Sequence, residues 1–134
     1  MDIPNKKVLF ICVGNTCRSQ MAEGFARAYS DGKIKVRSAG TAAYGEVVRP
    51  TIDVMNEKGI DVSRHTSEQL TSEQLEWADI VVSIADYTCP GSFQGRKIDW
   101  RIHDPFGGSM DAYRISRDEI EYRVKSLIDD IRGM

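Results

Sequence analysis

Apolar residues gather along the chain in four short runs that have the length and composition of β-strands. The first and third runs are apolar almost throughout, which is typical of strands buried on both faces of a parallel sheet. The second run alternates polar and apolar residues, as expected of a strand nearer the edge of a sheet. The predicted strands cover residues 7–12, 33–39, 79–84 and 97–102.

Between and after these runs, apolar residues recur at the spacing of one helix face. Ser19 stands in the N-cap position of the first such segment, and Asp31-Gly32 ends it. Pro50 suits the first turn of the second helix, and Gly59 stops that helix. The predicted helices cover residues 20–29, 50–58, 72–77 and 116–131.

Strands that alternate with helices predict an α/β fold with a parallel sheet. We expect a single three-layer domain over residues 1–134, with a four-stranded parallel sheet and helices on both faces. In such sheets, ligands bind beyond the carboxyl ends of the strands. Three candidate reactive segments follow the ends of predicted strands: Cys12, residues 87–89 and residues 103–106. We therefore expect them to lie at the same edge of the sheet.

Composition narrows the class of protein. Hydrophobic residues make up 41% and charged residues 28% of the chain, and the net charge is −2. This is a globular profile with scattered basic residues, which predicts no nucleic-acid surface. No apolar run approaches the roughly 20 residues that span a bilayer, and the N-terminus has no signal-peptide layout. We therefore expect a cytoplasmic protein that does not enter the membrane. In the reducing cytoplasm, its three cysteines indicate reactive thiols rather than structural disulfides.

The segment from Cys12 to Ser19 is the strongest chemical signal, because it links a buried strand to the N-terminus of a helix. Such a loop can turn backbone N–H groups inward, where the helix dipole also favours an anion. Gly14 and Asn15 readily take the positive φ that this curling requires. Arg18 can grip two oxygens of a tetrahedral anion, and Cys12 would point at its centre. The predicted oxyanion-binding loop comprises Val13, Gly14, Asn15, Thr16, Cys17, Arg18 and Ser19.

The cysteine at the end of the strand has several interpretations. A positive field favours the thiolate form of Cys12, to which Ser19 can donate a hydrogen bond, and predicts a nucleophile. A lone cysteine there is more often a small buried hydrophobe, but a Cys-x5-Arg-Ser loop between a strand and a helix is rare by accident and favours the nucleophile. Cys17 either packs or pairs reversibly with Cys12. A zinc site from Cys12, Cys17, Cys89 and His103 is disfavoured, because Arg18 would repel the ion.

A nucleophile that attacks phosphorus needs an acid to protonate the leaving oxygen. Asp104 follows the fourth predicted strand at the same sheet edge, and Pro105 would stiffen its loop. Asp-Pro alone is a common turn, but beside the cysteine loop it predicts a general acid.

These residues closely resemble the low-molecular-weight protein tyrosine phosphatase superfamily, which includes the thioredoxin-type arsenate reductases. The resemblance rests on residues 8–19, 38–41, 59–61 with His65, and 104–105. It implies a phosphocysteine intermediate on Cys12, an oxyanion bound by Arg18, and Asp104 as general acid and then base. It also implies that Asn15 and Ser19, and less firmly Ser38, brace the loop, with no metal or organic cofactor.

Several residues indicate which branch of this superfamily, the phosphatases or the arsenate reductases, the chain resembles more. Gln20 stands where phosphatases usually have Pro, and residues 65–67 are also similar to the reductases. Reductases pass oxidation along further cysteines, but Ala85 occupies the usual position of the first one. Only Cys89 is left as a possible redox partner, so a reductase would use Cys89 or an external thiol such as that of thioredoxin or glutaredoxin.

Two aromatic residues favour a phosphatase. Phe106 follows Asp104-Pro105, and Tyr44 lies in a loop that usually forms a pocket wall, so both could pack on a phosphotyrosine ring. Our preferred prediction is hydrolysis of phosphomonoesters such as phosphotyrosine in proteins. Reduction of arsenate with Cys89 as resolving thiol is the alternative, and a non-catalytic module that binds oxyanions or senses thiol oxidation is the third hypothesis.

Overall fold

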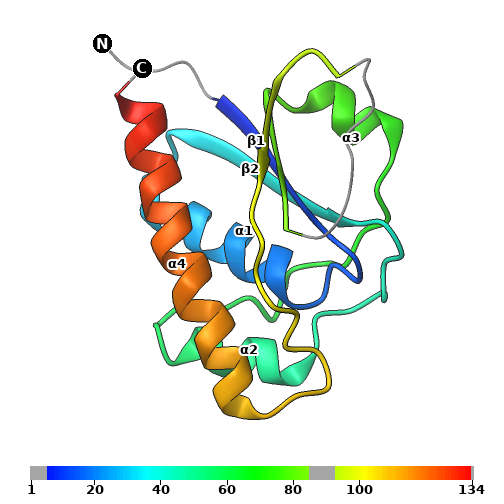
Figure 1. The fold of residues 1–134 in the computed structure, drawn as a ribbon, viewed down its shortest axis with the longest axis vertical. Helices are drawn as coiled ribbons and strands as arrows, with labels where there is room; N and C mark the ends of the chain where they lie inside the picture. Colours follow the sequence, from blue (N-terminus) through cyan, green and yellow to red (C-terminus); the bar gives the residue numbers. More distant parts are fainter. Residues whose placement is uncertain (1–5, 85–92, 134) are drawn as a thin grey trace.

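The computed structural model of the chain describes residues 6–84 and 93–133, and these form an α/β domain (Figure 1). The elements follow one another in the order β1 (Lys6–Cys12), α1 (Arg18–Tyr29), β2 (Ile34–Gly40), α2 (Arg49–Asn56), α3 (Ser72–Trp77), β3 (Ile80–Ser83), β4 (Arg96–Asp99) and α4 (Met110–Arg132). The predicted fold class is thereby confirmed.

The sheet is parallel throughout, and its strands lie side by side in the order β2-β1-β3-β4. β1 pairs with β2 along its whole length, so that Cys12 lies opposite Gly40. β2 is an edge strand, as its alternating pattern predicts. The carboxyl ends of the strands therefore meet at one edge of the sheet, where the loop after β1 begins.

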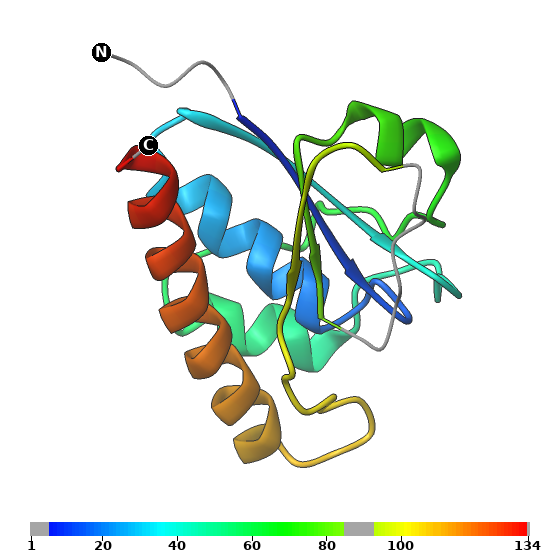
Figure 2. The ribbon, with the colours of Figure 1, turned by 45° about the horizontal axis from the view of Figure 1, so that its top comes forward.

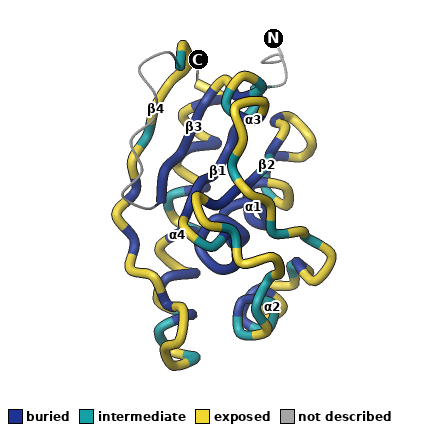
Figure 3. The backbone as a smooth tube through the Cα atoms, turned by 90° about the vertical axis from the view of Figure 1, so that its right-hand side faces the viewer, coloured by how far each residue is buried: buried dark blue, intermediate teal, exposed yellow. Residues whose placement is uncertain are grey.

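The two faces of the sheet are covered unequally. Val8 and Phe10 of β1 face the larger apolar cluster, which includes side chains of α1, α2 and α4. Leu9 and Ile11 face a smaller cluster that is covered by α3 and its flanking residues. Figure 2 shows α4 running along the first face across α1 and α2. Figure 3 shows that β1 and β3 are buried, whereas much of β4 is exposed.

Several boundaries differ from the predicted ones. α1 begins at Arg18 rather than after Ser19, because the Ser19 hydroxyl is engaged by Cys12 and does not cap the helix. β4 ends at Asp99 rather than 102, since the carbonyl oxygen of Ile102 accepts from Arg18 instead of joining the sheet. α4 begins at Met110 rather than 116, and Ser109 caps it by accepting a hydrogen bond from the Ala112 N–H.

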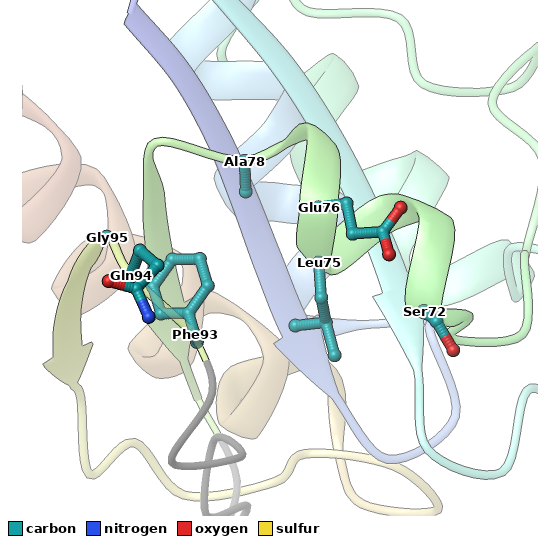
Figure 4. A pocket seen from close by; sticks show the side chains of 7 residues that line it. All are labelled: Ser72, Leu75, Glu76, Ala78, Phe93, Gln94 and Gly95. Atoms are coloured by element: carbon teal, nitrogen blue, oxygen red, sulfur yellow. The ribbon is translucent and has the colours of Figure 1, made fainter.

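The smaller face carries a hollow of about 400 Å³ between α3 and the residues that lead into β4 (Figure 4). Leu75 and Phe93 supply its apolar lining, and Ser72 and Glu76 lie at its polar side. The hollow contains none of the residues that the sequence marks as reactive. Among the described residues, no helix is long and apolar enough to cross a membrane.

The packing of α4 predicts a contrast between two isoleucines of the same helix. Ile120 is fully buried, whereas Ile115 is 69% exposed. We expect Ile120→Ala to lower the free energy of unfolding by about 2–5 kcal/mol, through lost burial and a residual cavity. Ile115→Ala should change it by less than about 0.5 kcal/mol. Urea denaturation of both variants measures the difference, and equal losses would mean that α4 packs in another orientation.

Candidate functional site

The loop that follows β1 curls around the sulfur of Cys12. Cys12 is 2% exposed at the end of the strand, and two groups of the loop contact its Sγ atom. The Ser19 Oγ atom lies 2.8 Å from the sulfur, and the backbone N–H of Asn15 donates to it over 3.3 Å. Because the Asn15 side chain already donates to Ser19 Oγ, the hydroxyl proton of Ser19 is free to point at the sulfur. Both contacts fix the position of the Cys12 sulfur at the base of the loop.

The carbonyl oxygens of the loop are turned outward. Those of Cys12, Val13 and Gly14 accept hydrogen bonds from the backbone N–H groups of Thr41, Ala42 and Tyr44. Farther along, the oxygens of Asn15 and Thr16 accept from the side chains of Gln20 and Thr51. A tight loop whose carbonyls point outward presents its N–H groups to the inside, which creates a concave anion site.

Asn15 holds the loop in this shape. Its backbone has a φ of +50°, as the sequence predicted, whereas Gly14 does not adopt a positive φ. The amide nitrogen of its side chain donates to Ser19 Oγ at 2.8 Å and to Ser38 Oγ at 2.9 Å. Its amide oxygen accepts from the backbone N–H of Glu68 at 2.7 Å. The side chain of Asn15 therefore ties the loop after β1 to α1, to β2 and to the segment around Glu68.

A segment that sequence reasoning missed supports the loop from outside. Ser67 Oγ donates to the carbonyl oxygen of Gly14, and Gln20 Nε2 donates to those of Asn15 and Thr66. The Gln20 Oε1 atom lies 3.0 Å from His65 Nδ1. Burial lowers the pKa of His65. Because the Gln20 amide nitrogen already donates to two carbonyl oxygens, the Gln20 Oε1 atom accepts from the His65 Nδ1–H. One sign of this support is present in the sequence, which is that Gln20 and residues 65–67 are similar to those of the reductases.

The end of β2 closes against the same loop. A Cβ atom at Gly40 would overlap the carbonyl oxygen of Val13 and come within 2.9 Å of the Asn15 nitrogen. Position 40 therefore requires a glycine, because β2 and the loop approach each other backbone to backbone. The same residue bonds outward through its N–H and C=O to Glu68 and Leu70.

Arg18 lies in the first turn of α1 and is held by the sheet. Its Nη1 atom donates to the carbonyl oxygens of Ile84 at 2.8 Å and Ile102 at 3.0 Å, which follow β3 and β4. Its Nη2 atom lies 3.5 Å from Asp104 Oδ2. The buried Nε atom has no hydrogen-bond partner in the described part of the chain. Nε and Nη2 are therefore the donors of the guanidinium that can bind a tetrahedral anion.

Asp104 lies on the opposite wall of the site. One carboxylate oxygen, Oδ1, accepts from the backbone N–H of Phe106 at 3.0 Å, so the carboxylate has a fixed orientation. The other oxygen, Oδ2, is the one beside Arg18, and the side chain is 48% exposed. The structure thus brings together Cys12 at the end of β1, Arg18 at the start of α1 and Asp104 in the loop after β4.

These residues line a cavity of about 190 Å³. Tyr44 and Phe106 form its mouth, are 56% and 51% exposed, and touch each other with ring centroids 5.8 Å apart. The lining residues are Cys12, Val13, Gly14, Thr16, Cys17, Arg18, Ala42, Tyr44, Asp104 and Phe106. The volume lies below the roughly 300–1,000 Å³ of sites for organic ligands.

Cys17 occupies the N-cap position of α1, where its side chain makes no capping hydrogen bond. The thiol is 2% exposed and lies 3.7 Å from the hydroxyl oxygen of Tyr113. Burial raises the pKa of Cys17 to about 11, so the thiol is neutral near pH 7. The sequence also suggested Cys89 and the loop of residues 87–89 as candidates, and these lie outside the described residues.

The described residues contain no group of three or more His, Cys, Asp or Glu side chains that could hold a metal ion. Cys12 and Cys17 are free thiols, each engaged by hydroxyl groups rather than by a second ligand. The cavity presents a thiol, a guanidinium and backbone N–H groups, and the last two are groups that bind anions.

Two relatives can be aligned with nearly the whole of this sequence. A glutaredoxin arsenate reductase of Synechocystis sp. is 40% identical over 131 residues, which cover 94% of this chain and 98% of the relative. Arsenate reductase 2 of Staphylococcus saprophyticus is 39% identical over 130 residues, covering 93% and 98% of the two chains.

Solved structures give the same likeness in three dimensions. An arsenate reductase in a phosphate-binding state has a TM-score of 0.86 and 38% identity, covering 94% of this chain and 98% of its own. The YwlE arginine phosphatase of Geobacillus stearothermophilus has a TM-score of 0.80 and 31% identity, covering 96% and 94%. The sequence profile of one family matches residues 7–133, and this chain belongs to that family, the low molecular weight phosphotyrosine protein phosphatases.

Proposed function

We propose that this protein is an arsenate reductase that uses Cys12 as its nucleophile. The proposal rests on the anion cavity, which has a volume of about 190 Å³ and is lined by both Cys12 and Arg18. The Nε atom of Arg18 has no hydrogen-bond partner among the described residues and can bind an anion there. The relatives that are 38–40% identical over most of the chain bear the name arsenate reductase. This reverses the preference for a phosphatase that the aromatic residues suggested.

The two rings at the mouth argue against a bound phosphotyrosine ring. Paired aromatic rings keep their centroids about 4.5–7 Å apart, so a third ring held between two others would separate the outer centroids by about 9 Å or more. Tyr44 and Phe106 are 5.8 Å apart and contact each other directly. A small inorganic oxyanion needs no space between the two rings, and the cavity of about 190 Å³ that they border is small.

The first chemical step is attack of the Cys12 thiolate on arsenic. Arg18 and the loop N–H groups hold the arsenate oxygens, and the sulfur displaces one hydroxyl group. Asp104 Oδ2 faces that side of the cavity and donates the proton with which the hydroxyl leaves as water. The product is an arsenic(V) adduct with a bond from arsenic to the Cys12 sulfur.

The second step needs another thiol. Its sulfur attacks Cys12 Sγ, a disulfide forms, and the electron pair of the broken S–As bond stays on arsenic, which leaves as arsenite. Cys17 is a poor candidate, because its thiol is buried and its pKa is raised to about 11. The thiol then comes from Cys89 or from an external partner, and the glutaredoxin named in the Synechocystis relative favours a glutaredoxin-type dithiol that restores Cys12.

Formation of arsenite from arsenate in the presence of glutathione and glutaredoxin tests the proposal. We expect turnover by the wild type and a loss of at least about 1,000-fold in Cys12→Ser, because a hydroxyl cannot form the adduct or the disulfide. Mass spectrometry of the anaerobic reaction without glutathione then shows whether Cys89 forms the first disulfide with Cys12.

Phosphate binding to Cys12→Ser is the matched control, since the anion loop and Arg18 remain in place. A variant that still binds phosphate but makes no arsenite has lost chemistry and not its fold. If the wild type made no arsenite but hydrolysed a phosphotyrosine peptide in a Cys12-dependent way, the protein would instead be a phosphatase.

The raised pKa of Cys17 predicts how its alkylation depends on pH. Only the thiolate reacts, so the rate at Cys17 should rise about tenfold per pH unit from pH 7 to pH 10 without levelling. In the urea-unfolded chain, the rate should level off near pH 9, around the ordinary thiol pKa of about 8.5. Iodoacetamide labelling with peptide mapping measures both curves. A plateau below pH 9 in the folded protein would show that Cys17 is an accessible thiolate and a candidate for the second step.

A further inference from the structure

The anion loop depends on the direction of each of its peptide groups. In a planar trans peptide, the carbonyl oxygen of one residue and the N–H of the next point to opposite sides. The structure shows this at Gly14, whose carbonyl oxygen accepts from the Tyr44 N–H on the outside of the loop. The N–H of the same peptide belongs to Asn15 and points inward, at the Cys12 sulfur. A group that holds a carbonyl oxygen outside the loop therefore also aims the following N–H into it.

The carbonyl oxygens of the loop have partners of two kinds. Those of residues 12–14 accept from backbone N–H groups, which do not depend on the side chain of the donor residue. Those of Asn15 and Thr16 accept from side chains, namely from Gln20 Nε2 at 3.1 Å and Thr51 Oγ1 at 3.0 Å. No backbone N–H of the described residues donates to either oxygen. The direction of these two peptides therefore depends on which residues stand at positions 20 and 51.

Both side chains are fixed in the core. Gln20 in the first turn of α1 and Thr51 in the first turn of α2 are fully buried. The Gln20 amide nitrogen also donates to the carbonyl oxygen of Thr66 at 2.9 Å, so both of its protons are used. Its Oε1 atom lies 3.0 Å from His65 Nδ1. Neither Gln20 nor Thr51 lines the cavity, so each acts on an anion only through the loop.

The N–H groups that follow these two carbonyls belong to Thr16 and Cys17. Both residues line the cavity, and they lie directly before α1, whose N-terminus favours an anion. Neither N–H donates to a backbone carbonyl oxygen of the described residues. Buried N–H groups need an acceptor, and an oxyanion in the cavity provides one.

We propose that Gln20 and Thr51 are positioning residues, whose side chains aim two N–H groups of the loop at a bound oxyanion. Gln20 orients the peptide before Thr16, and Thr51 orients the peptide before Cys17. The inference deepens the proposed function and rests on one part of it, the binding of an oxyanion in the cavity. It applies equally to arsenate and to phosphate, because both are tetrahedral anions.

The variant Thr51→Val keeps the shape of the side chain and removes its donor. The carbonyl oxygen of Thr16 then loses its partner, and the peptide before Cys17 can rotate away from the anion. We expect the affinity for inorganic phosphate, measured by isothermal titration calorimetry, to fall about fivefold or more, because a hydrogen bond to a charged group is weakened. Thr51→Ser restores the hydroxyl and should recover the affinity to within about twofold. Equal losses in the Val and Ser variants would overturn the role of the hydroxyl.

Two buried glutamines provide a matched pair for the second side chain. Gln20→Met keeps the length of the chain without a donor, and should also lower the affinity for phosphate about fivefold or more. Gln74 is 2% exposed in α3, where its Oε1 atom accepts from the Thr71 N–H. Gln74→Met should destabilise the fold but keep the affinity within about twofold. An equal loss of affinity in both variants would mean that it follows general stability, and would overturn the proposal.

Amide NMR spectra at saturating phosphate distinguish positioning from a general structural effect. A charge-assisted hydrogen bond to the anion moves the proton resonance of the donating N–H downfield, and we expect such shifts at Thr16 and Cys17 in the wild type. Thr51→Val should reduce the shift at Cys17 and leave that at Thr16, whereas Gln20→Met should do the reverse. The same loss at both amides in both variants would overturn the proposal.

These measurements require no turnover, so they separate the positioning role from the proposed reaction. A wild type that binds phosphate and forms no arsenite, with variants that show the expected losses, would overturn the arsenate reductase and support the positioning role. A wild type that reduces arsenate, with both variants binding phosphate as tightly as it does, would overturn the positioning role alone. A wild type that binds no phosphate would also overturn the positioning role, because it requires a bound oxyanion.

Discussion

The left-handed backbone of Asn15 is the constraint on which the anion site depends. A non-glycine residue pays for a positive φ, and here buried hydrogen bonds to Ser19, Ser38 and Glu68 hold it there. With Asn15 fixed, its N–H reaches the Cys12 sulfur and the carbonyls of the loop face outward. The polarity of the cavity follows from this single backbone conformation.

The sheet supplies the second fixed point. Arg18 could adopt many rotamers, but the carbonyl oxygens that follow β3 and β4 take one of its terminal nitrogens. These two carbonyls lie at the carboxyl ends of neighbouring parallel strands, which is where such folds place their ligand sites. The remaining donors of the guanidinium then face the cavity without further rotamer entropy to lose on binding. The acid loop closes the opposite wall, and the Ser116 hydroxyl holds it by donating to the carbonyl oxygen of His103, immediately before Asp104.

The positions of the helices and strands could be predicted well where one pattern dominated. β1 and α1 follow an apolar run and a helical repeat, so their ends were predicted within two residues. The start of α4 was predicted six residues late, because Ser116 has the appearance of a cap but bonds to His103, whereas Ser109 is the true cap. The end of β4 was predicted three residues too late, because Trp100 and Ile102 are buried without belonging to a strand.

The sequence by itself determined the order of strands and helices and the loop from Cys12 to Ser19, because those features depend on neighbouring residues. It also marked Arg18 and Asp104 as partners of Cys12. Only the tertiary structure decided that residues 65–69 support the loop, that Tyr44 and Phe106 touch across the mouth, and that Cys17 meets Tyr113. These contacts join residues far apart in the chain, 53 positions for Ser67 and Gly14 and 96 positions for Tyr113 and Cys17. No local periodicity encodes such pairs, since they form only when the folded sheet brings distant segments to one edge.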